Sequence, residues 1–270
     1  MKIYGLDFTS RPRRDKPITC LEMEFLADTL AFKKLYELIT FEKLEELLHS
    51  SGPWVMGMDF PFGLPRKFIE NIGWPKSWRA YVDHVSTLTR DEFRAALNEY
   101  RHNRAVGDKE HRRATDVSAR SISPQKLYGV PVGLMFYEGA PRIRRSGSTI
   151  PLLQTGDPER IILEAYPGVL ARDLIGRRAY KHDDKKKQTP EKAEARAEIV
   201  ARIKNFGLPD SFGFRVEAPE YLQEDPSGDQ LDALLCAIQA AWAWKSKEQN
   251  YGAPKVVDEL EGWIAHPFTD

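Results

Sequence analysis

The pattern of hydrophobic and polar positions predicts a sheet built early in the chain. Residues 2–8 (KIYGLDF) form a short apolar run, and residues 16–25 (KPITCLEMEF) alternate between two faces with the period of a strand. A third strand is expected within 28–38. Residues 40–52 (TFEKLEELLHSSG) place leucines on one helical face and stop at Gly52. The predicted order therefore begins with three strands and a helix.

Two later apolar runs end on an acid that is followed by an aromatic residue and a proline. Residues 54–60 (WVMGMDF) lead to Asp59, and Pro61 then cannot pair in a ladder. Residues 160–168 (RIILEAYPG) repeat the pattern with Glu164. Both segments are predicted as strands with a carboxylate at the carboxyl end.

The segment 66–158 differs in character from the sequence on either side of it. It begins with charged helical sequence and continues as loops rich in proline, glycine and serine. We therefore predict an α/β core made by residues 1–65 and 159–270, with 66–158 as a helical and loop insertion.

Three segments complete the core. Residues 181–189 (KHDDKKKQT) are expected to be a solvated loop, and a helix through about 204 follows, with Pro190 at its first position. Residues 226–244 form a long apolar helix that carries Asp229 and Asp232 in its first turn. This helix can pack across the sheet and bring its acids to the strand ends.

Composition narrows the possible partners only slightly. The chain has 270 residues, 41% of them apolar, and 40 basic residues balance 40 acidic ones. No overall field favours a polyanion, so nucleic-acid binding would depend on local patches. Cys20 and Cys236 lie in apolar stretches and are expected to be buried thiols in a reducing compartment. With no signal peptide and no long apolar stretch, we expect a cytoplasmic protein without a membrane partner.

Two local basic segments are candidates for binding nucleic acid. Residues 101–126 contain seven Lys or Arg against three acids, and residues 141–145 (PRIRR) add three arginines. Solvated helix faces would explain the same residues. The sequence lacks the P-loop, G-x-S-x-G, H-E-x-x-H and G-x-G-x-x-G motifs. It therefore gives no sign of the enzyme classes that these motifs usually mark.

The acids at the strand ends suggest a chemistry. In an α/β sheet, strand carboxyl ends face the crevice where ligands bind, so Asp7, Asp59 and Glu164 would point to one place. Asp229 and Asp232 are three residues apart and share a helix face. Such a cluster repels itself unless a cation fills it, and Mg²⁺ or Mn²⁺ takes oxygen ligands and leaves positions for phosphates. Two such ions support phosphodiester hydrolysis.

Each acid also has a structural alternative. Asp7 can start a turn, and Asp59 can terminate a strand. Glu164 can pair with a base such as Arg172. An acid at a helix N-cap with another at N3 satisfies free amides, which would explain the last two acids without a metal. The functional interpretation therefore depends on whether the acids come together.

Four short motifs, GLDFTS, GMDFPFGLP, EAYPG and DQLDALLCA, resemble in this order the domain of unknown function 429 family, whose members are regarded as predicted nucleases. The opening strands and the late acidic helix are similar to the ribonuclease H-like fold and to RuvC-type resolvases. The resemblance implies an α/β fold with a ribonuclease H-like mixed sheet and flanking helices, and a Mg²⁺- or Mn²⁺-dependent nuclease acting on nucleic acid. It carries over Asp7, Asp59, Glu164, Asp229 and Asp232 as catalytic acids. Of these, Asp7, Asp59, Glu164 and Asp232 are the predicted metal ligands. The resemblance does not decide which of Asp229 and Asp232, or which of Asp59 and Glu164, contacts the metal.

Two other functions remain open from the sequence. A nucleotide-binding phosphotransferase of the actin-like and sugar-kinase group shares a related core, although such proteins normally have two such domains and glycine-rich phosphate loops. A catalytically silent module that binds nucleic acid or protein would use the same acids for capping and ion pairs. The type of nucleic acid, endo- or exonuclease action and the oligomeric state are not decided by the sequence.

Overall fold

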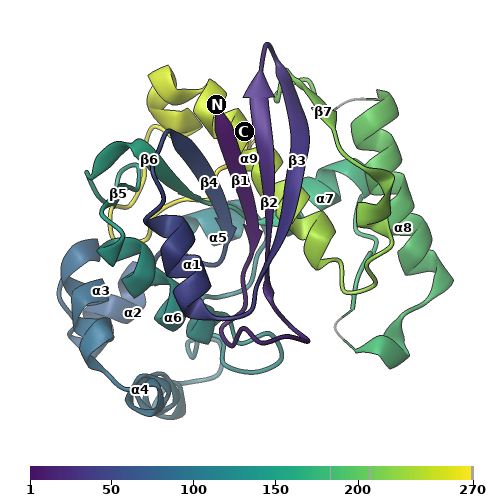
Figure 1. The fold of residues 1–270 in the computed structure, drawn as a ribbon. Helices are drawn as coiled ribbons and strands as arrows, with labels where there is room; N and C mark the ends of the chain where they lie inside the picture. Colours follow the sequence, from purple (N-terminus) through teal and green to yellow (C-terminus); the bar gives the residue numbers. More distant parts are fainter. Residues whose placement is uncertain (183, 207, 269–270) are drawn as a thin grey trace.

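A seven-stranded mixed sheet organises the chain in the computed structural model, which describes residues 1–182, 184–206 and 208–268 (Figure 1). The strand order is β5-β6-β4-β1-β2-β3-β7. The strands are β1 (Lys2–Asp7), β2 (Ile18–Leu26), β3 (Thr29–Leu38), β4 (Trp54–Asp59), β5 (Ser148–Thr149), β6 (Asp157–Glu164) and β7 (Arg215–Glu217).

Strand directions make the sheet mixed. β1 pairs antiparallel with β2 across a connection of residues 8–17, and β2 pairs antiparallel with β3 across a two-residue turn. β1, β4 and β6 run parallel to one another, with β5 and β7 as short parallel edges. This α/β architecture confirms the predicted fold class and is consistent with a ribonuclease H-like sheet.

Helices cover both faces of the sheet. One apolar core joins the sheet to α7, α8 and α9, and a second joins the opposite face to α1, α2, α3, α4 and α6 (Figure 1). None of the described helices is long and apolar enough to cross a membrane. The helices are α1 (Phe41–Leu48), α2 (Arg66–Ile72), α3 (Trp78–Thr87), α4 (Arg90–His102), α5 (Ala114–Ser118), α6 (Val132–Arg145), α7 (Pro167–Ile175), α8 (Pro190–Ala201) and α9 (Asp229–Lys245).

Two glycines let α9 press against the middle of the sheet. Gly5 on β1 and Gly57 on β4 are partners in the parallel register. A Cβ atom on Gly5 would come within 2.0 Å of the Ala233 carbonyl oxygen, and one on Gly57 within 2.4 Å of the Cys236 carbonyl oxygen. The helix backbone therefore approaches these strands more closely than any side chain there would allow.

Several expected boundaries shift, and two strands are new. The strand expected at 160–168 is β6, which ends at Glu164 because Pro167 begins α7. The helix expected to reach 204 leaves the α conformation after Ala201 and continues as a π turn. β5 and β7 are too short to give a periodic signal and were not predicted. The division into core and insertion stays a prediction.

The two cysteines occupy the interior. Cys20 on β2 and Cys236 on α9 are both buried free thiols. Cys20 belongs to the apolar core that joins the sheet to α1, α2, α3, α4 and α6. On the other face of the sheet, the Cys236 backbone lies against Gly57. The prediction that they behave as small buried side chains and do not form a bridge is confirmed.

Candidate metal centre

The parallel strands bring two predicted acids to the same edge of the sheet. Asp7 ends β1 and Asp59 ends β4, and the two residues are direct partners in the parallel register. Directly paired residues project to the same face, which here is the face covered by α9. Asp232 lies one turn into α9, so the close approach of this helix places a third acid at the strand ends.

Asp7, Asp59 and Asp232 together form the acidic cluster. Each offers one carboxylate oxygen, and these three oxygens lie within 4.8 Å of one another. Asp232 is fully buried, Asp7 is nearly so, and Asp59 is partly exposed. Three oxygen donors at this separation are a donor set that hard divalent cations such as Mg²⁺ or Mn²⁺ prefer.

Burial makes negative charge costly in the cluster. It raises the pKa of the Asp7 carboxyl well above its usual range, an effect that Lys181 opposes and the neighbouring acids reinforce. Burial and the charge of Asp232 raise the pKa of Asp59 to about 7. Burial also raises the pKa of Asp232, against the opposing effect of Lys181. A bound cation would favour the ionised forms of all three.

Two residues that were not predicted contact Asp232 directly. The Tyr180 hydroxyl donates to Oδ1 of Asp232 at 2.6 Å, and the Lys181 ammonium group pairs with Oδ2. The prediction of a solvated loop at 181–189 is therefore wrong at its first residue, because the Lys181 ammonium is held at the cluster. Asp183 of that loop lies outside the described residues.

Asp229 lies beside the acidic cluster without being part of it. Lys16, on the connection between β1 and β2, contacts the Asp229 carboxylate at 3.2 Å. The Asp229 side chain is not the N-cap, since the N-cap residue is Gly228, with a φ of 76°, and Asp225 accepts from the Gln230 amide at the helix start. The two acids of the first turn thus each contact a lysine.

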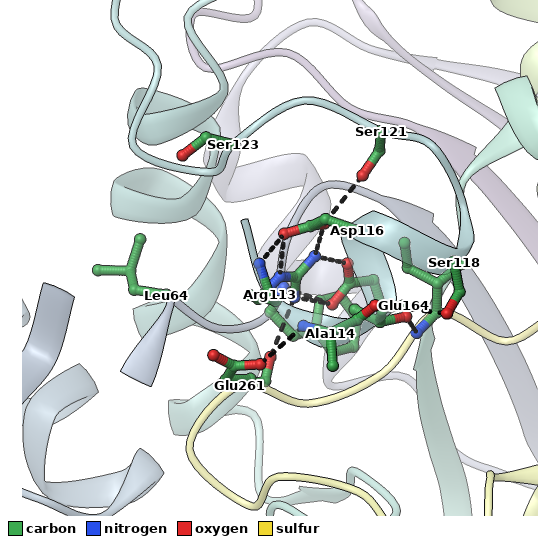
Figure 2. A network of polar contacts seen from close by, with 12 residues as sticks. Leu64, Arg113, Ala114, Asp116, Ser118, Ser121, Ser123, Glu164 and Glu261 are labelled. Atoms are coloured by element: carbon green, nitrogen blue, oxygen red, sulfur yellow. Dashed lines mark hydrogen bonds and ion pairs between the residues drawn. The ribbon is translucent and has the colours of Figure 1, made fainter. Parts of the chain in front are cut away.

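Glu164 is engaged in a different network. Its carboxylate accepts two hydrogen bonds from the Arg113 guanidinium, at 2.5 and 2.8 Å, and one from the Phe62 amide at 2.8 Å (Figure 2). Arg113 also binds Asp116 and the Glu261 carbonyl oxygen. The alternative that Glu164 pairs with Arg172 or another base is confirmed, and the base is Arg113. Arg172 instead donates to the Ala119 carbonyl oxygen.

Strand register explains why Glu164 is absent from the acidic cluster. Glu164 pairs with Met58, one residue before Asp59. Successive side chains of a strand point to opposite faces, so the Glu164 side chain leaves the sheet on the face opposite to Asp59. There Arg113, only 1% exposed in its side chain, neutralises it.

Two cavities open beside the acidic cluster. The larger, of about 550 Å³, is lined among others by Asp7, Asp59, Asp229, Lys16 and Lys181. The smaller, of about 270 Å³, is lined among others by Asp59, Lys181, Arg113, Glu164 and Tyr166. Because Asp59 and Lys181 line both cavities, we treat them as one cleft, in which Asp7 and Asp59 of the acidic cluster form part of the wall.

Comparison with known proteins identifies a family. A family model described as "Protein of unknown function (DUF429)" matches residues 20–256. No curated protein matches the chain. No solved structure matches it either.

Proposed function

Because the chain belongs to the DUF429 family, whose description assigns no reaction, we propose its function from the site: metal-dependent hydrolysis of phosphodiester bonds in nucleic acid. Mg²⁺ or Mn²⁺ would be held by Asp7, Asp59 and Asp232. The observation that carries the proposal is the convergence of three carboxylate oxygens within 4.8 Å of one another beside a cleft. Fold alone would not carry it, since one fold hosts many functions.

The donor set fits a hard divalent cation. All three groups are carboxylates, and two of them are buried where mutual repulsion is costly. When bound, such an ion supplies positive charge that polarises a phosphoryl oxygen and lowers the pKa of a coordinated water. A bound ion would thus offset the repulsion between the buried carboxylates and would also supply the chemistry of hydrolysis.

The remaining cleft residues suit a phosphodiester substrate. Lys16 and Lys181 place ammonium groups on the cleft wall, where they can bind non-bridging phosphate oxygens. Val130, Pro131 and Met135 line the same cleft and give it an apolar side, against which a sugar or base can lie. The partly exposed Asp59 presents its carboxylate between these two kinds of wall.

Glu164 has a supporting role in this proposal. Its predicted role as a metal ligand would require the carboxylate to leave Arg113 and turn to the other face of the sheet. As it lies, Glu164 holds the Phe62 amide and so fixes the chain directly after Asp59. We propose a centre of three aspartates that is positioned by the Glu164–Arg113 ion pair on the opposite face of the sheet.

The test is a cleavage assay with labelled single-stranded DNA, double-stranded DNA, RNA and an RNA–DNA hybrid, in Mg²⁺, Mn²⁺ or EDTA. We expect cleavage of at least one substrate that requires metal. It should fall about 100-fold or more in Asp7→Asn, because loss of a ligand removes several kcal/mol of charge stabilisation. Asp210→Asn, at an exposed position, is the matched control and should cleave normally. Absence of cleavage of all four substrates with both metals would refute the proposal.

A catalytically silent binding module is the second candidate. One observation favours it: Lys181 already pairs with Asp232, and Lys16 with Asp229, so each of these acids has a cationic partner in the protein itself. Such a module would bind nucleic acid equally well in EDTA and as Asp7→Asn, and it would cleave nothing.

We also propose that the protein works in the cytoplasm. Its two cysteines are free and buried, which fits a compartment that keeps thiols reduced. Fluorescence microscopy of the tagged full chain in its own host would test this location.

A further inference from the structure

Half of the basic residues in the two basic segments form ion pairs with the protein's own acids. Five of their ten Lys and Arg side chains are paired in this way, which reduces the charge that is free for a polyanion. The pairs are Arg101–Glu110, Arg104–Asp108, Arg113–Asp116, Arg142–Glu138 and Arg144–Asp83. One of the remaining basic residues, Arg120, lines a cavity together with arginines from outside the two segments.

A different group of arginines lines a separate cavity of about 480 Å³. We name it the arginine pocket; its arginines are Arg120, Arg172, Arg177 and Arg178. No acidic residue is among the described residues that line it. Guanidinium groups around one cavity repel one another unless acids of the protein or an entering anion compensate their charge.

Local structure explains how these arginines converge. Arg120 follows α5 with a φ of 51°, and Gly176 ends α7 with a φ of 71°, so both chain segments turn sharply at the pocket. The Arg172 guanidinium donates to the Ala119 carbonyl oxygen at 2.9 Å and ties the two turns together. The pocket is thus built from two fixed segments.

Two of the four arginines are available for an anion. Arg178 pairs with Glu198, which also binds Arg202, and Arg172 is held by the carbonyl oxygen. Arg120 and Arg177 are exposed, and neither contacts a carboxylate in the part of the chain that the structure describes. Their guanidinium groups can bind phosphate oxygens in two-pronged geometry.

The arginine pocket adjoins the acidic cluster. Tyr180 lines the pocket, and its hydroxyl donates to Asp232 at 2.6 Å. The next residue, Lys181, lines the cleft. On the other segment, Arg120 lines the pocket while Ser121 and Ile122 line the cleft. A chain of phosphates lying in the cleft would therefore pass the arginine pocket.

We propose that the arginine pocket binds a backbone phosphate of a polynucleotide, next to the phosphodiester that lies at the acidic cluster. This inference rests on the proposed function. It places substrate contacts on Arg120, which lies in the first basic segment, and on Arg177, which lies outside both. It also implies that the substrate extends beyond the reacting bond on the side of α7.

Binding of a fluorescent single-stranded oligonucleotide in EDTA, followed by anisotropy at several KCl concentrations, tests the pocket without cleavage. We expect Arg120→Gln/Arg177→Gln to weaken binding about tenfold at moderate salt and to reduce the salt slope by about 0.7, since the pocket holds one phosphate and each single-strand phosphate contact contributes about 0.7. Arg79→Gln/Arg94→Gln removes two exposed arginines from α3 and α4 and is the matched control. Unchanged binding and slope in the pocket variant would overturn the inference.

The outcomes separate this inference from the proposed nuclease. Arginine-dependent binding by a protein that cleaves nothing would support the pocket and refute the nuclease. Metal-dependent cleavage, with oligonucleotide binding unaffected by the pocket substitutions, would support the nuclease and refute the role of the arginine pocket. Thermal stabilisation by pyrophosphate that requires Arg120 and Arg177, with oligonucleotide binding unchanged, would identify a small free anion as the occupant and overturn the polynucleotide assignment.

Discussion

Arg113 allows the buried Glu164 carboxylate to stay ionised. A buried carboxylate without a partner would be too costly to keep ionised, and the Arg113 guanidinium supplies both hydrogen bonds and charge. The same guanidinium serves Asp116, so one cation stands between two buried acids (Figure 2). Buried networks of this kind depend on every member being present.

Arg113→Leu should therefore destabilise the protein strongly. It leaves Glu164 and Asp116 buried without their cation, and breaking a buried pair in this way costs about 3–5 kcal/mol. Urea denaturation monitored by circular dichroism measures the loss. Arg94→Leu, at an exposed position of α4, should stay within about 0.5 kcal/mol of the wild type. A loss below about 1 kcal/mol for Arg113→Leu would show that the network is not needed for stability.

For single residues, the sequence predicts the acids of the site better than it predicts the basic residues that pair with them. Asp7 and Asp59 stand out because each ends an apolar run, and register then pairs them. Arg113 gives no comparable signal, since it lies in a charged segment where most arginines are solvated. Lys181 likewise looks like the start of a polar loop. Its contact with Asp232 depends on the packing of α9, which local sequence does not encode.

The element that assembles the site is α9. Its backbone crosses β1 and β4 where both strands have glycine, and this closeness brings Asp232 to Asp7 and Asp59. The helix is apolar on nearly every side, as expected for one buried beneath other elements. Site geometry is therefore fixed by packing in the core and not by a mobile loop.

Gly57→Ala should push α9 away from the sheet. Its new methyl group would lie 2.4 Å from the Cys236 carbonyl oxygen, and overpacking of this kind costs about 1–3 kcal/mol. We expect both a lower melting temperature and a smaller stabilisation by Mn²⁺. Val55→Ala, in the same strand, loses buried methyl groups without displacing the helix and should keep the Mn²⁺ effect. Equal Mn²⁺ effects in the two variants would contradict the role given to α9.

Periodicity predicts the central elements because each is long and patterned. It does not predict which face of the sheet an acid occupies. Asp59 and Glu164 both end apolar runs, yet a shift of one residue in the β4–β6 register separates them onto opposite faces. Register is set by pairing across the sheet. The sequence could therefore predict the acids of the candidate site, but not that Glu164 lies apart from the other three.

Across the whole molecule, the acidic cluster joins segments from both ends of the sequence. Asp7 and Asp59 come from strands in the first quarter of the chain, and Asp232 comes from the last helix. Unfolding separates these groups, so an ion held by all three binds the native state only. Metal binding should therefore appear as a change in global stability.

We expect Mn²⁺ to raise the melting temperature of the wild type by about 5–10 °C, since a ligand at 100 times its Kd adds about 2.7 kcal/mol. Asp7→Asn should melt higher than the wild type in EDTA, because it removes a buried carboxylate that is costly to ionise, as the raised pKa of Asp7 indicates. The same variant should lose most of the Mn²⁺ shift. Asp210→Asn should match the wild type in both respects. Differential scanning fluorimetry measures all three proteins. An equal Mn²⁺ shift in Asp7→Asn and the wild type would mean that manganese binds elsewhere, and a lower melting temperature for Asp7→Asn in EDTA would mean that this carboxylate stabilises the fold without metal.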